Sequence, residues 1–571
     1  MKFSRFLVGT LACALMAACS NEENPAVDNG TQGQEGSSYM AVNLVMSTDA
    51  ASRSATDGGF ADGSENEGAV SVQESLFLFY DKDGKFVASG RIMSDDKFLT
   101  LNDPTNDTPE GNIEKTAIVA VGPTATKPAQ VLAILNCGTS PSLNSLPLDQ
   151  ALEETVENIS GEKGDFLMTN AVYVSDGKIV TATQVTEDNF VDTPTEAATT
   201  NAVNIYVERV AAKLEVKVKV DGTENNKESG ALTGNNFSLN LETGTLMQVE
   251  IDGWCANAIN TESYYVKKLS NDWLTTEPFS GWTGIYRTFW ALDKNYTGDN
   301  TYTGLSYKSW SDAKENAASS IYLHENTIDN SKTDDVYNYV NIEGGDEANV
   351  TTVLVAAHIE YKKEEDKDWK TGNIFRYNGV YYTEDVMKQN IVSSGNYYWY
   401  YTSNNTEHWD ALDVESGNEK GANIEFKSVT DSPDAVMIDV TITKPTIQGV
   451  EADAIKLVQG EDSKTEVQIT DAQTNLEKSP YTQNLIGYQN GACYYQIPIE
   501  HLSSSTGNEF YGIVRNHWYE LTITDITDIG GAVFNPDVEL PIIPGKEKNY
   551  YMSAKLNILS WKVVKQDAVL N

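Results

Sequence analysis

Cys19, near the start of the chain, is the first residue whose type and neighbours indicate a covalent modification. Two basic residues, Lys2 and Arg5, precede an apolar stretch of 13 residues (6–18) that ends in two alanines directly before the cysteine. This pattern predicts a bacterial lipoprotein signal, in which small residues admit a signal peptidase and the Cys19 thiol carries a diacylglycerol, with palmitate as one acyl chain. The stretch is too short to span a bilayer, so the lipid is the predicted membrane attachment. The alternative, an uncleaved buried helix, is disfavoured because polar residues 20–23 follow at once.

A second reactive position is the peptide bond between Arg53 and Ser54. Arg53 is the only basic residue between Cys19 and Lys82, and it lies between a small polar stretch and a run rich in glycine and acidic residues. Exposed loops of this composition are the preferred places for proteolysis. A protease of trypsin-like specificity would therefore find one place to cut in this segment.

Catalytic and metal-binding signatures are missing from the sequence. There is no Gly-x-Ser-x-Gly elbow, no phosphate loop and no dinucleotide-binding glycine pattern. The five histidines are scattered, and no His-x-x-x-His or Cys-x-x-Cys spacing supports a zinc site. We therefore expect no enzyme, no metal and no cofactor.

Two histidine segments leave alternatives to compare. His358 shares a strand face with Glu360 in the mostly apolar run 353–361, which favours a solvent-facing strand histidine over a metal ligand. Residues 515–517 (Arg-Asn-His) contain groups that could transfer protons. No nucleophile accompanies them, however, and they lead into an alternating strand, so we predict a structural role.

Aromatic residues gather in the segment 396–401 (Asn-Tyr-Tyr-Trp-Tyr-Tyr), with His408 and Trp409 nearby. Exposed aromatic faces could form a platform on which sugars stack. A strand that buries every second aromatic side chain is the favoured alternative. The role of the cluster formed by residues 397–401 stays open at this point.

The composition restricts the classes of partner. The 571 residues include 41 basic and 83 acidic residues, so the formal net charge is 41 − 83 = −42. A chain of this charge repels the phosphate backbone, and we expect no nucleic-acid partner. With 40% hydrophobic and 10% aromatic residues the chain can still bury a large core.

The hydrophobic period is two far more often than 3.6. Residues 213–220 alternate without a fault, which predicts a strand with one wet and one dry face. Asp83-Gly84, Asn378-Gly379 and Asn490-Gly491 each separate two such runs, and these dipeptides favour tight hairpin turns. Helical patterns are confined to short pieces such as 149–158 and 383–389. We therefore predict a mostly β, antiparallel fold with a few short helices.

The two ends of the chain carry matching apolar stripes. Alternate residues near the N-terminus are apolar, and the same holds near the C-terminus: Met40, Val42, Leu44 and Met46, then Met552, Ala554, Leu556 and Ile558. Cleavage after Arg53 could remove the first strand and open a groove, which the C-terminal strand of another copy could fill by β-strand addition. Burial of four such side chains at about 1.5–3 kcal/mol each would contribute roughly 6–12 kcal/mol. The alternative is that both are ordinary strands of one subunit.

Several of these features occur together in one known family. The sequence resembles the Bacteroidales fimbrillins, the subunits of type V pili, and most closely the major subunits of the minor (Mfa-type) fimbriae. The resemblance is carried by the lipoprotein signal, the arginine after a short first strand and four segments in a fixed order: Phe-Leu-Met-Thr-Asn at 166–170, Val-Glu-Arg-Val-Ala-Ala-Lys-Leu at 207–214, Val-Arg-Asn-His-Trp-Tyr-Glu-Leu at 514–521, and residues 550–561.

The resemblance implies a prepilin that crosses the envelope as a lipoprotein and polymerises by donor-strand exchange. Each subunit in that family has two antiparallel β-sandwich domains of the transthyretin-like, Greek-key type. Carried onto this chain, it implies acylation at Cys19, cleavage between Arg53 and Ser54, and a donor strand that includes Trp561. The implied division of the chain is a signal peptide (1–19), a propeptide with the first strand (20–53), an N-terminal domain (54–222), a C-terminal domain (223–549) and the donor strand (550–571).

The resulting expectation is a structural subunit of a fimbrial shaft that supports cell adhesion and biofilm formation. Its precursor would be an outer-membrane lipoprotein and its mature form part of a fimbrium on the cell surface. The implied partners are other copies of the chain, accessory anchor and tip subunits, and a processing protease of trypsin-like specificity. Host or bacterial surface receptors are not identified by the sequence. Two alternatives stay open, namely an anchor or tip subunit and a surface lipoprotein that binds glycans through the aromatic cluster.

Overall fold

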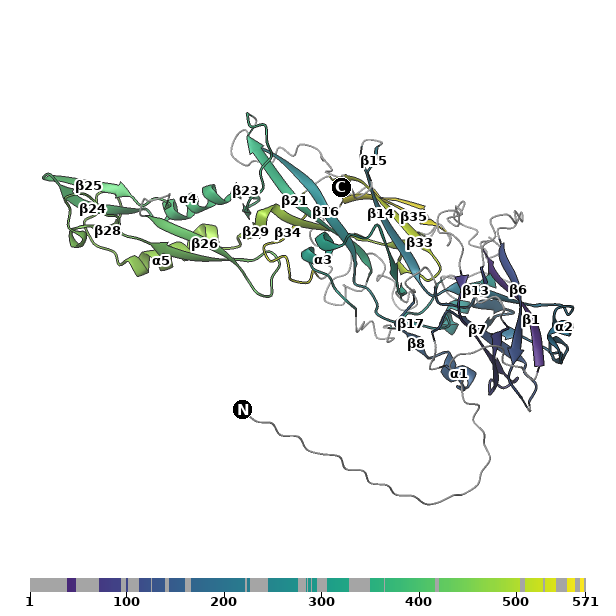
Figure 1. Cartoon of the computed structure of the whole chain (residues 1–571). Helices are drawn as coiled ribbons and strands as arrows, with labels where there is room; N and C mark the ends of the chain where they lie inside the picture. Colours follow the sequence, from purple (N-terminus) through teal and green to yellow (C-terminus); the bar gives the residue numbers. More distant parts are fainter. Residues whose placement is uncertain are drawn as a thin grey trace, which may run out of the picture.

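The computed structural model places several parts of the chain, with gaps between them. It describes residues 38–47, 71–93, 99–100, 112–124, 126–138, 143–159, 166–220, 223–225, 245–275, 284, 286–288, 290–294, 305–327, 350–363, 365–415, 421–503, 509–526, 529–540, 552–559 and 565–568. The described part is mostly β-structure with short helices, as the period-two patterns predict. The molecule is elongated, with the first sheet at one end and a separate β-rich extension at the other (Figure 1).

The N-terminal sheet closes on itself. Its strand order is β12-β7-β3-β4-β6-β1-β13-β9, and an additional pairing between β7 and β9 joins seven of the strands into a ring. The strands are β1 (Ser38–Ser47), β3 (Ser75–Tyr80), β4 (Phe86–Ile92), β6 (Asn112–Val121), β7 (Gln130–Leu135), β9 (Met168–Asn170), β12 (Thr183–Gln184) and β13 (Val203–Arg209). The ring has an apolar interior, which includes Phe77, Phe79, Val119, Val131 and Val207.

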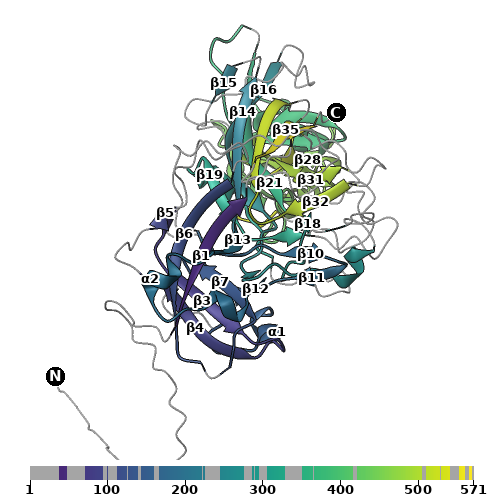
Figure 2. The same cartoon turned by 90° about the vertical axis from the view of Figure 1, so that its right-hand side faces the viewer.

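Two sheets face each other in the middle of the molecule. One has the order β15-β14-β33-β35-β36, with β19 also paired to β14, and the other has the order β16-β21-β30-β34. Their strands are β14 (Ala212–Val220), β15 (Thr223–Asn225), β16 (Thr245–Asn257), β19 (Ser320–Leu323), β21 (Thr352–Lys363), β30 (Ala492–Pro498), β33 (Trp518–Ile526), β34 (Gly531–Ala532), β35 (Met552–Leu559) and β36 (Lys565–Ala568). Figure 2 shows the long strands β14, β16, β21 and β35 beside one another.

The core between these two sheets follows from the alternation in their strands. In β14, Leu214 and Val216 are buried against Val355 and Leu521, while Lys217 on the other face pairs with Glu520 at 2.6 Å. The predicted dry face is confirmed for Leu214 and Val216. The wet face is confirmed only in part, because Lys213 is buried with its ammonium group 3.7 Å from the centre of the Trp518 ring. β14 pairs in parallel with β33.

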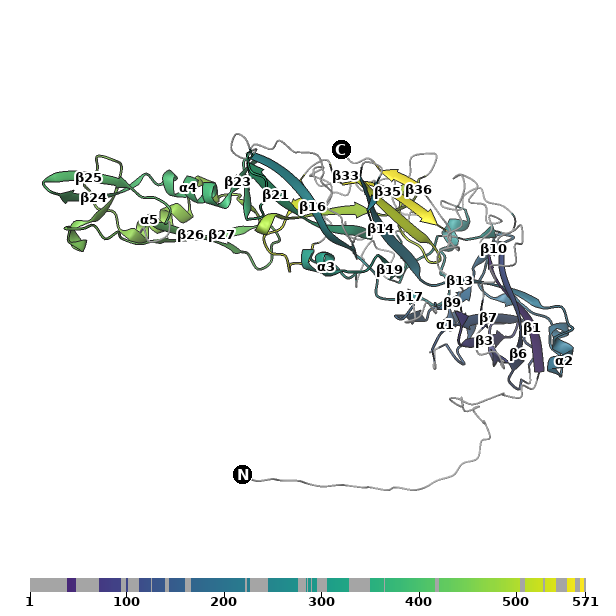
Figure 3. The same cartoon turned by 45° about the horizontal axis from the view of Figure 1, so that its top comes forward.

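A third region is inserted between β21 and β30. It has its own hydrophobic core, which includes Met387, Trp399 and Leu476. Its strands are β22 (Ile374–Tyr377), β23 (Val380–Thr383), β24 (Tyr397–Ser403), β25 (Thr406–Ala411), β26 (Ala422–Ser428), β27 (Val436–Ile442), β28 (Lys456–Gln459) and β29 (Ile486–Tyr488), and its helices are α4 (Glu384–Ser394) and α5 (Ile469–Glu477). Figures 1 and 3 both place β24 and β25 at the end of the molecule opposite β1.

Shorter elements complete the described structure. Short strands form small separate sheets: β2 (Ser71–Val72) with β5 (Leu99–Thr100), β8 (Thr155–Val156) with β17 (Ser263–Tyr264), β10 (Tyr173–Ser175) with β11 (Lys178–Val180) and β18 (Tyr286–Arg287), and β32 (Glu509–Ile513) with β20 (Asn326–Thr327) and β31 (Glu500–Ser503). The remaining α-helices are α1 (Leu148–Ala151), α2 (Pro194–Ala197) and α3 (Trp310–Glu315). Across the described ranges, no helix has the length and apolar character needed to cross a membrane.

The turn predictions have mixed outcomes. Asp83-Gly84 joins β3 to β4 as predicted, and Asp81 Oδ1 accepts hydrogen bonds from the backbone N–H groups of Asp83 and Lys85, both at 2.9 Å. The hairpin across Asn378-Gly379 is also confirmed, with positive φ at both residues. The hairpin across Asn490-Gly491 is wrong, because β29 pairs with β22 while β30 pairs with β21 and β34. Positive φ alone does not decide whether a chain reverses within one sheet.

Both predicted helical segments contain a helix, but neither helix has the predicted length. The pattern at 383–389 becomes α4, which continues to Ser394. The pattern at 149–158 yields only α1, because Thr155 and Val156 pair with Tyr264 and Ser263 as a short strand. Tertiary pairing has overridden the local helical spacing there.

The division of the chain into domains stays a prediction. The polar stretch that motivated a boundary near 222 lies largely outside the described residues, as do residues 328–349. The strand before that stretch, β14, pairs with β33 and β19 of the middle sheet rather than with the N-terminal ring.

Candidate functional site

β1 is an interior strand of the N-terminal ring. It pairs with β6 in antiparallel register over ten residue pairs, from Ser38↔Val121 to Ser47↔Asn112. On its other side it pairs with β13 in parallel register, from Val42↔Val203 to Val45↔Tyr206. Figure 2 shows β1 running between β6 and β13. The strand therefore has hydrogen-bonding partners along both edges.

The stripe predicted for β1 faces the core. Met40, Val42 and Leu44 are each fully buried in the interior of the ring, and Met46 is paired in the strand although its side chain lies outside the described part. The intervening residues are less uniform, since Ala41 is buried while Asn43 is half-buried. Burial of the three described apolar side chains corresponds to roughly 4.5–9 kcal/mol, at about 1.5–3 kcal/mol each.

Polar contacts with neighbouring segments fix the register of β1. The Asn43 side-chain amide donates to Asn204 Oδ1 at 3.2 Å, across the parallel pair with β13. At the start of the strand, Tyr39 and Val191 exchange backbone hydrogen bonds of 2.8 and 2.9 Å. These contacts disfavour a slip by one residue, which would turn the apolar stripe away from the core.

Removal of β1 would open a groove between β6 and β13, because β1 lies between these two strands. Ten positions of β6 and four of β13 would lose their strand partner. The core facing that gap is apolar and includes Phe77, Val119 and Ile205. A strand edge next to an apolar surface is the kind of site that accepts an added β-strand.

The C-terminal strands β35 and β36 lie at the end of their sheet, whereas β1 lies in the interior of the ring. β35 pairs with β33 in antiparallel register, from Trp518↔Leu559 to Ile526↔Met552, and β36 pairs with β35 at the outer edge of the same sheet. The backbone of the predicted donor residues Met552, Ala554, Leu556 and Ile558 is therefore in a strand, while their side chains lie outside the described part. Loss of β35 and β36 would leave the inner order β15-β14-β33 unchanged.

Other predicted positions have no structural description. Cys19, Arg53, Ser54 and Trp561 lie outside the described residues, so acylation and cleavage at these positions stay predictions.

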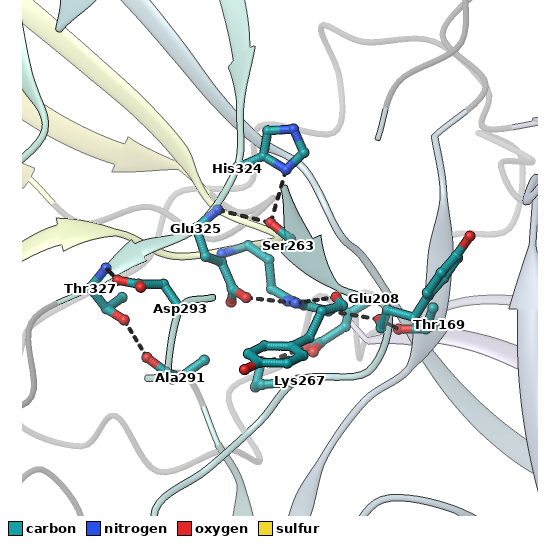
Figure 4. Close-up of polar contacts among 12 residues, drawn as sticks. Thr169, Glu208, Ser263, Lys267, Ala291, Asp293, His324, Glu325 and Thr327 are labelled. Carbon is teal, nitrogen blue, oxygen red and sulfur yellow. Dashed lines mark hydrogen bonds and ion pairs between the residues drawn. The ribbon is translucent and has the colours of Figure 1, made fainter. Parts of the chain in front are cut away.

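Three of the segments that carry the family resemblance, 166–170, 207–214 and 514–521, meet at a buried polar junction. Glu208, on β13, forms an ion pair with Lys267 at 3.0 Å, and both side chains are about 1% exposed. The Lys267 ammonium group also donates to the carbonyl oxygen of Thr288 at 2.8 Å. The Thr169 hydroxyl donates to the carbonyl oxygen of Tyr265 at 2.8 Å. Figure 4 shows these groups together with Ser263, His324 and Glu325.

Arg515 forms most of the polar contacts of the junction on the side of the middle sheets. Its guanidinium group is fully buried and pairs with Glu325 at 2.6 Å. It also donates to the carbonyl oxygens of Tyr265 and Tyr264, at 3.0 and 2.8 Å. Thr169 and Arg515 thus bind the same carbonyl group from the two sides of the junction. A planar guanidinium group that donates to several acceptors suits such a buried role.

Asn516 connects the junction back to the N-terminal ring. Its side-chain oxygen accepts from the backbone N–H of Arg209 at 3.3 Å, and its own N–H donates to the carbonyl oxygen of Ala211 at 2.9 Å. Asn516 has φ of 60°, a left-handed conformation that asparagine adopts more readily than most residues. The backbone N–H of Lys213 donates to the carbonyl oxygen of His517 at 2.9 Å. Residues 515–517 thus have structural partners, as predicted.

Histidines line the junction, with His501 buried and His324 half-buried. Burial lowers the pKa of His324 to about 4, and its Nδ1 lies 3.0 Å from the Ser263 hydroxyl. Burial also lowers the pKa of His501 well below its ordinary value, with the charges of His517 and Lys267 acting in the same direction. His501 Nδ1 lies 2.7 Å from the Tyr519 hydroxyl. The junction therefore favours neutral imidazoles at these two positions.

Sequence reasoning missed half of this junction. Lys267 and Glu325 carry no motif, and each sits far along the chain from its partner. The only available signal was weak, namely the valine that directly precedes each of Glu208 and Arg515. Charged residues in such settings are almost never fully buried unless they are paired.

The aromatic cluster divides between the two faces of β24. Tyr397, Trp399 and Tyr401 are buried in the core of the inserted region, as the favoured alternative predicts. Tyr400 lies on the other face beside Trp409, with ring centroids 5.1 Å apart. The Lys464 ammonium group covers both rings, at 5.8 and 5.7 Å from their centroids. This arrangement gives no support to an open sugar-stacking platform.

Comparison with known proteins points to one family. Residues 487–567 match the family model described as "Major fimbrial subunit protein type IV, Fimbrillin, C-terminal". This range includes the junction residues Arg515 and Asn516 and the strands β33 and β35. The match bears out the resemblance to Bacteroidales type V fimbrillins and supports a fimbrial subunit at the cell surface. A search among curated proteins finds no match.

Solved structures give weaker likenesses. A candidate cell adhesion protein from Parabacteroides distasonis has 11% identity and a TM-score of 0.31, with 93% of this chain and 98% of that chain covered. The tip fimbrial protein Mfa3 from Porphyromonas gingivalis has 10% identity and a TM-score of 0.28, with 91% and 99% covered. A fimbrial assembly protein from Parabacteroides distasonis has 12% identity and a TM-score of 0.25, with 58% and 84% covered. At these scores the likenesses carry no structural argument.

Proposed function

We propose that this chain, which resembles the Bacteroidales type V fimbrillins, is a structural subunit of a fimbrial shaft. It is exported as a lipoprotein acylated at Cys19, cleaved after Arg53 and polymerised by donor-strand exchange. The acylated precursor resides in the outer membrane, and the mature subunit supports adhesion and biofilm formation. Two domains of the family's β-sandwich, Greek-key type belong to the same proposal, with β14 in the C-terminal one.

The single observation that carries the proposal is the interior position of β1. Its apolar side chains fill the core, and the strand is paired along both edges. The proposed cut after Arg53 lies only six residues beyond Ser47, the end of β1. Loss of a surface strand would have little effect, whereas loss of this strand opens the ring and exposes a long apolar groove.

The position of β35 and β36 at the end of their sheet supports the role of β35 as the donor. β35 and β36 are the last two strands of their sheet, so they can leave without breaking any pairing among β15, β14 and β33. β35 offers eight residues, and β6 has ten positions paired with β1. Main-chain hydrogen bonds then supply the pairing, and alternate side chains supply the register.

The buried junction supports a subunit that transmits force along a filament. Two buried ion pairs and shared carbonyl acceptors link the N-terminal ring to the middle sheets. Separation of these regions would leave buried charges without partners, which is costly. Hydrogen bonds of this kind favour one fixed arrangement of the two regions.

The proposal is tested with the full-length precursor, a variant that lacks residues 550–571 and an Arg53→Ala variant. Limited digestion with trypsin is followed by intact-mass measurement and by electron microscopy. The proposal expects filaments from the cleaved full-length protein, cleaved monomers from the deletion, and uncleaved monomers from Arg53→Ala. Filaments formed by the deletion variant would contradict donor-strand exchange, and filaments formed by Arg53→Ala would contradict the requirement for cleavage.

Two neighbouring assignments predict different outcomes. An anchor subunit would retain its acylated Cys19 on the cell, and a tip subunit would polymerise no further from its C-terminal strand. A glycan-binding surface lipoprotein would bind polysaccharide and would not form filaments. The shaft is favoured because β35 has a regular alternation of apolar residues and forms, with β36, the end of its sheet. The processing protease, the anchor and tip partners, and a purely structural role without enzymatic activity belong to the same proposal.

A further inference from the structure

A cluster of titratable side chains lies on the outer face of β16 and β21, away from the site of assembly. Glu250 and His358 are directly opposite each other in the antiparallel pair, and Glu360 follows two residues later on the same face of β21. One ligand atom from each of these three residues lies within 4.8 Å of the others. All three residues are only partly exposed.

A fourth residue orients the imidazole. The register shifts between Ile251 and Gly253, so Asp252 is the extra residue of a β-bulge in β16. Its Oδ2 lies 2.9 Å from Nδ1 of His358. Bulges of this kind re-aim side chains next to functional sites. A carboxylate that accepts a hydrogen bond from Nδ1 fixes the neutral tautomer whose Nε2 lone pair is free to bind a metal.

The geometry around Nε2 matches a metal site that needs only small side-chain rotations. Nε2 of His358 is 3.9 Å from Glu250 Oε2 and 3.9 Å from Glu360 Oε1. Ligand atoms around a tetrahedral Zn²⁺ are separated by about 3.3–3.5 Å, given bond lengths of about 2.0–2.2 Å. A Zn²⁺ ion between the three atoms would shorten the two separations from Nε2 by roughly half an ångström and would bring the two carboxylate oxygens, which lie within 4.8 Å of each other, to a similar distance. A water molecule would then complete the coordination.

The surroundings of the cluster favour a cation. Three carboxylates face one imidazole, and Lys314 pairs with the outermost of them, with its Nζ 3.4 Å from Asp252 Oδ1. The Gln248 side-chain amide donates to the second carboxylate oxygen of Glu360 at 2.5 Å, which leaves Oε1 directed to His358. The carboxylates raise the pKa of His358, chiefly through the hydrogen bond to Asp252. Zn²⁺ would replace the proton that these carboxylates otherwise attract.

We propose that Glu250, His358 and Glu360 form a binding site for a divalent first-row transition metal of the Zn²⁺ type, with Asp252 as a positioning residue. One nitrogen and two carboxylate oxygens are a mixed donor set that suits Zn²⁺ better than Ca²⁺ or Mg²⁺, which take oxygen ligands. The site joins β16 to β21 across their outer face. Its function is distinct from strand exchange, and it does not depend on cleavage at Arg53.

The test uses the full chain, metal-free, titrated with Zn²⁺ alone by isothermal titration calorimetry and checked by native mass spectrometry. We expect one Zn²⁺ ion per chain, retained in a hundredfold excess of Mg²⁺ and Ca²⁺. His358→Ala and Glu360→Gln should each weaken binding at least tenfold, and Asp252→Asn should weaken it about 10–100-fold. His408→Ala, which removes another half-buried strand histidine, should leave binding unchanged.

Separate outcomes overturn the proposal. Absence of Zn²⁺ binding by the wild-type chain would refute it, and so would equal binding by His358→Ala. Displacement of Zn²⁺ by Mg²⁺ or Ca²⁺ at the stated excess would show only an acidic surface that attracts cations. The thermal unfolding midpoint of each variant, measured without metal, identifies variants that lose binding because they fail to fold. Glu250→Gln provides a second isosteric substitution in case Glu360→Gln is unstable.

Discussion

Val42 and Val203 lie opposite each other in parallel register, which places a fully buried side chain of the first strand next to β13. On its other side, Val42 faces Ala117 of β6 in antiparallel register. The ring is therefore completed by a strand that the proposed cleavage would remove. The energy that holds β1 in place is the energy that a donor strand must replace.

The first prediction concerns the apolar stripe of β1. Val42→Asp places a carboxylate without a partner in the core of the ring, so we expect it to lower the free energy of unfolding of the precursor by about 3–5 kcal/mol. Asn43→Ser, on the half-buried face of the same strand, is the matched control and should have a small effect. Chemical denaturation of both variants measures the difference, and equal stability would contradict the interior position of β1.

The second prediction concerns the buried ion pair between Arg515 and Glu325. Glu325→Gln leaves the Arg515 guanidinium buried without its counter-charge, so we expect a loss of about 3–5 kcal/mol in the free energy of unfolding. The double variant Arg515→Met with Glu325→Leu should recover part of this loss because it removes both charges. Lys427→Met breaks an exposed ion pair with Asp439 and should leave the unfolding midpoint nearly unchanged. A similar midpoint shift in Glu325→Gln and Lys427→Met would refute the role of the junction.

The third prediction is the pH dependence of the junction. The pKa of His324 is about 4 in the folded chain and about 6.5 when unfolded, so the unfolded state binds the proton more tightly. Its contribution is present above pH 6.5 and is lost as the pH falls from 6.5 to about 4, by roughly 3 kcal/mol at most. His324→Asn, which can keep the bond to Ser263, should flatten the stability profile in this window.

His358 provides a control of opposite sign. Its pKa is raised, chiefly by the hydrogen bond to Asp252, so its contribution is present at low pH and lost as the pH rises through its folded pKa. His358→Asn should therefore lower stability on the acidic side instead of raising it there. Urea denaturation from pH 4 to 8 measures both variants. Identical profiles for His324→Asn and the wild type would contradict the buried neutral state of His324.

The fourth prediction separates the core role of Trp399 from a binding role. Trp399 is nearly fully buried in the core of the inserted region, so Trp399→Ala should destabilise that region by about 3–5 kcal/mol. Trp409→Ala, on the outer face of the same hairpin, should have a smaller effect on unfolding. Limited proteolysis and thermal unfolding measure both changes. Loss of polysaccharide binding in Trp409→Ala, with unfolding unchanged, would instead revive the glycan-binding alternative.

The alternation of apolar and polar residues predicted which side chains of a single strand are buried. The stripe at Met40, Val42 and Leu44 describes burial correctly, because the two-residue period of a strand depends only on the local chain. The alternation at 213–220 does the same for Leu214 and Val216 but fails at Lys213, which is buried over the ring of Trp518. The hairpin at Asn490-Gly491 could not be judged in this way. The same positive φ serves a hairpin and a crossover between sheets, and distant strands decide which one forms.

The sequence could not predict which charged residues far apart in the chain would form ion pairs. Glu208 and Lys267 are separated by 59 residues, and Arg515 and Glu325 by 190. Nothing in the spacing of such charges indicates that they meet, because the contact depends on the folded arrangement of several segments. The segment 514–521 was nevertheless singled out, because it carries part of the family resemblance and because residues 515–517 lead into an alternating strand.

The central claim is that the first strand is removed before the subunit enters a filament. The most direct measurement is the intact mass of the chain isolated from the cell surface, which defines its N-terminal residue. The account predicts a start at Ser54, with residues 20–53 and the lipid absent. A chain that begins at acylated Cys19 would retain β1 in the ring and would contradict assembly through the groove.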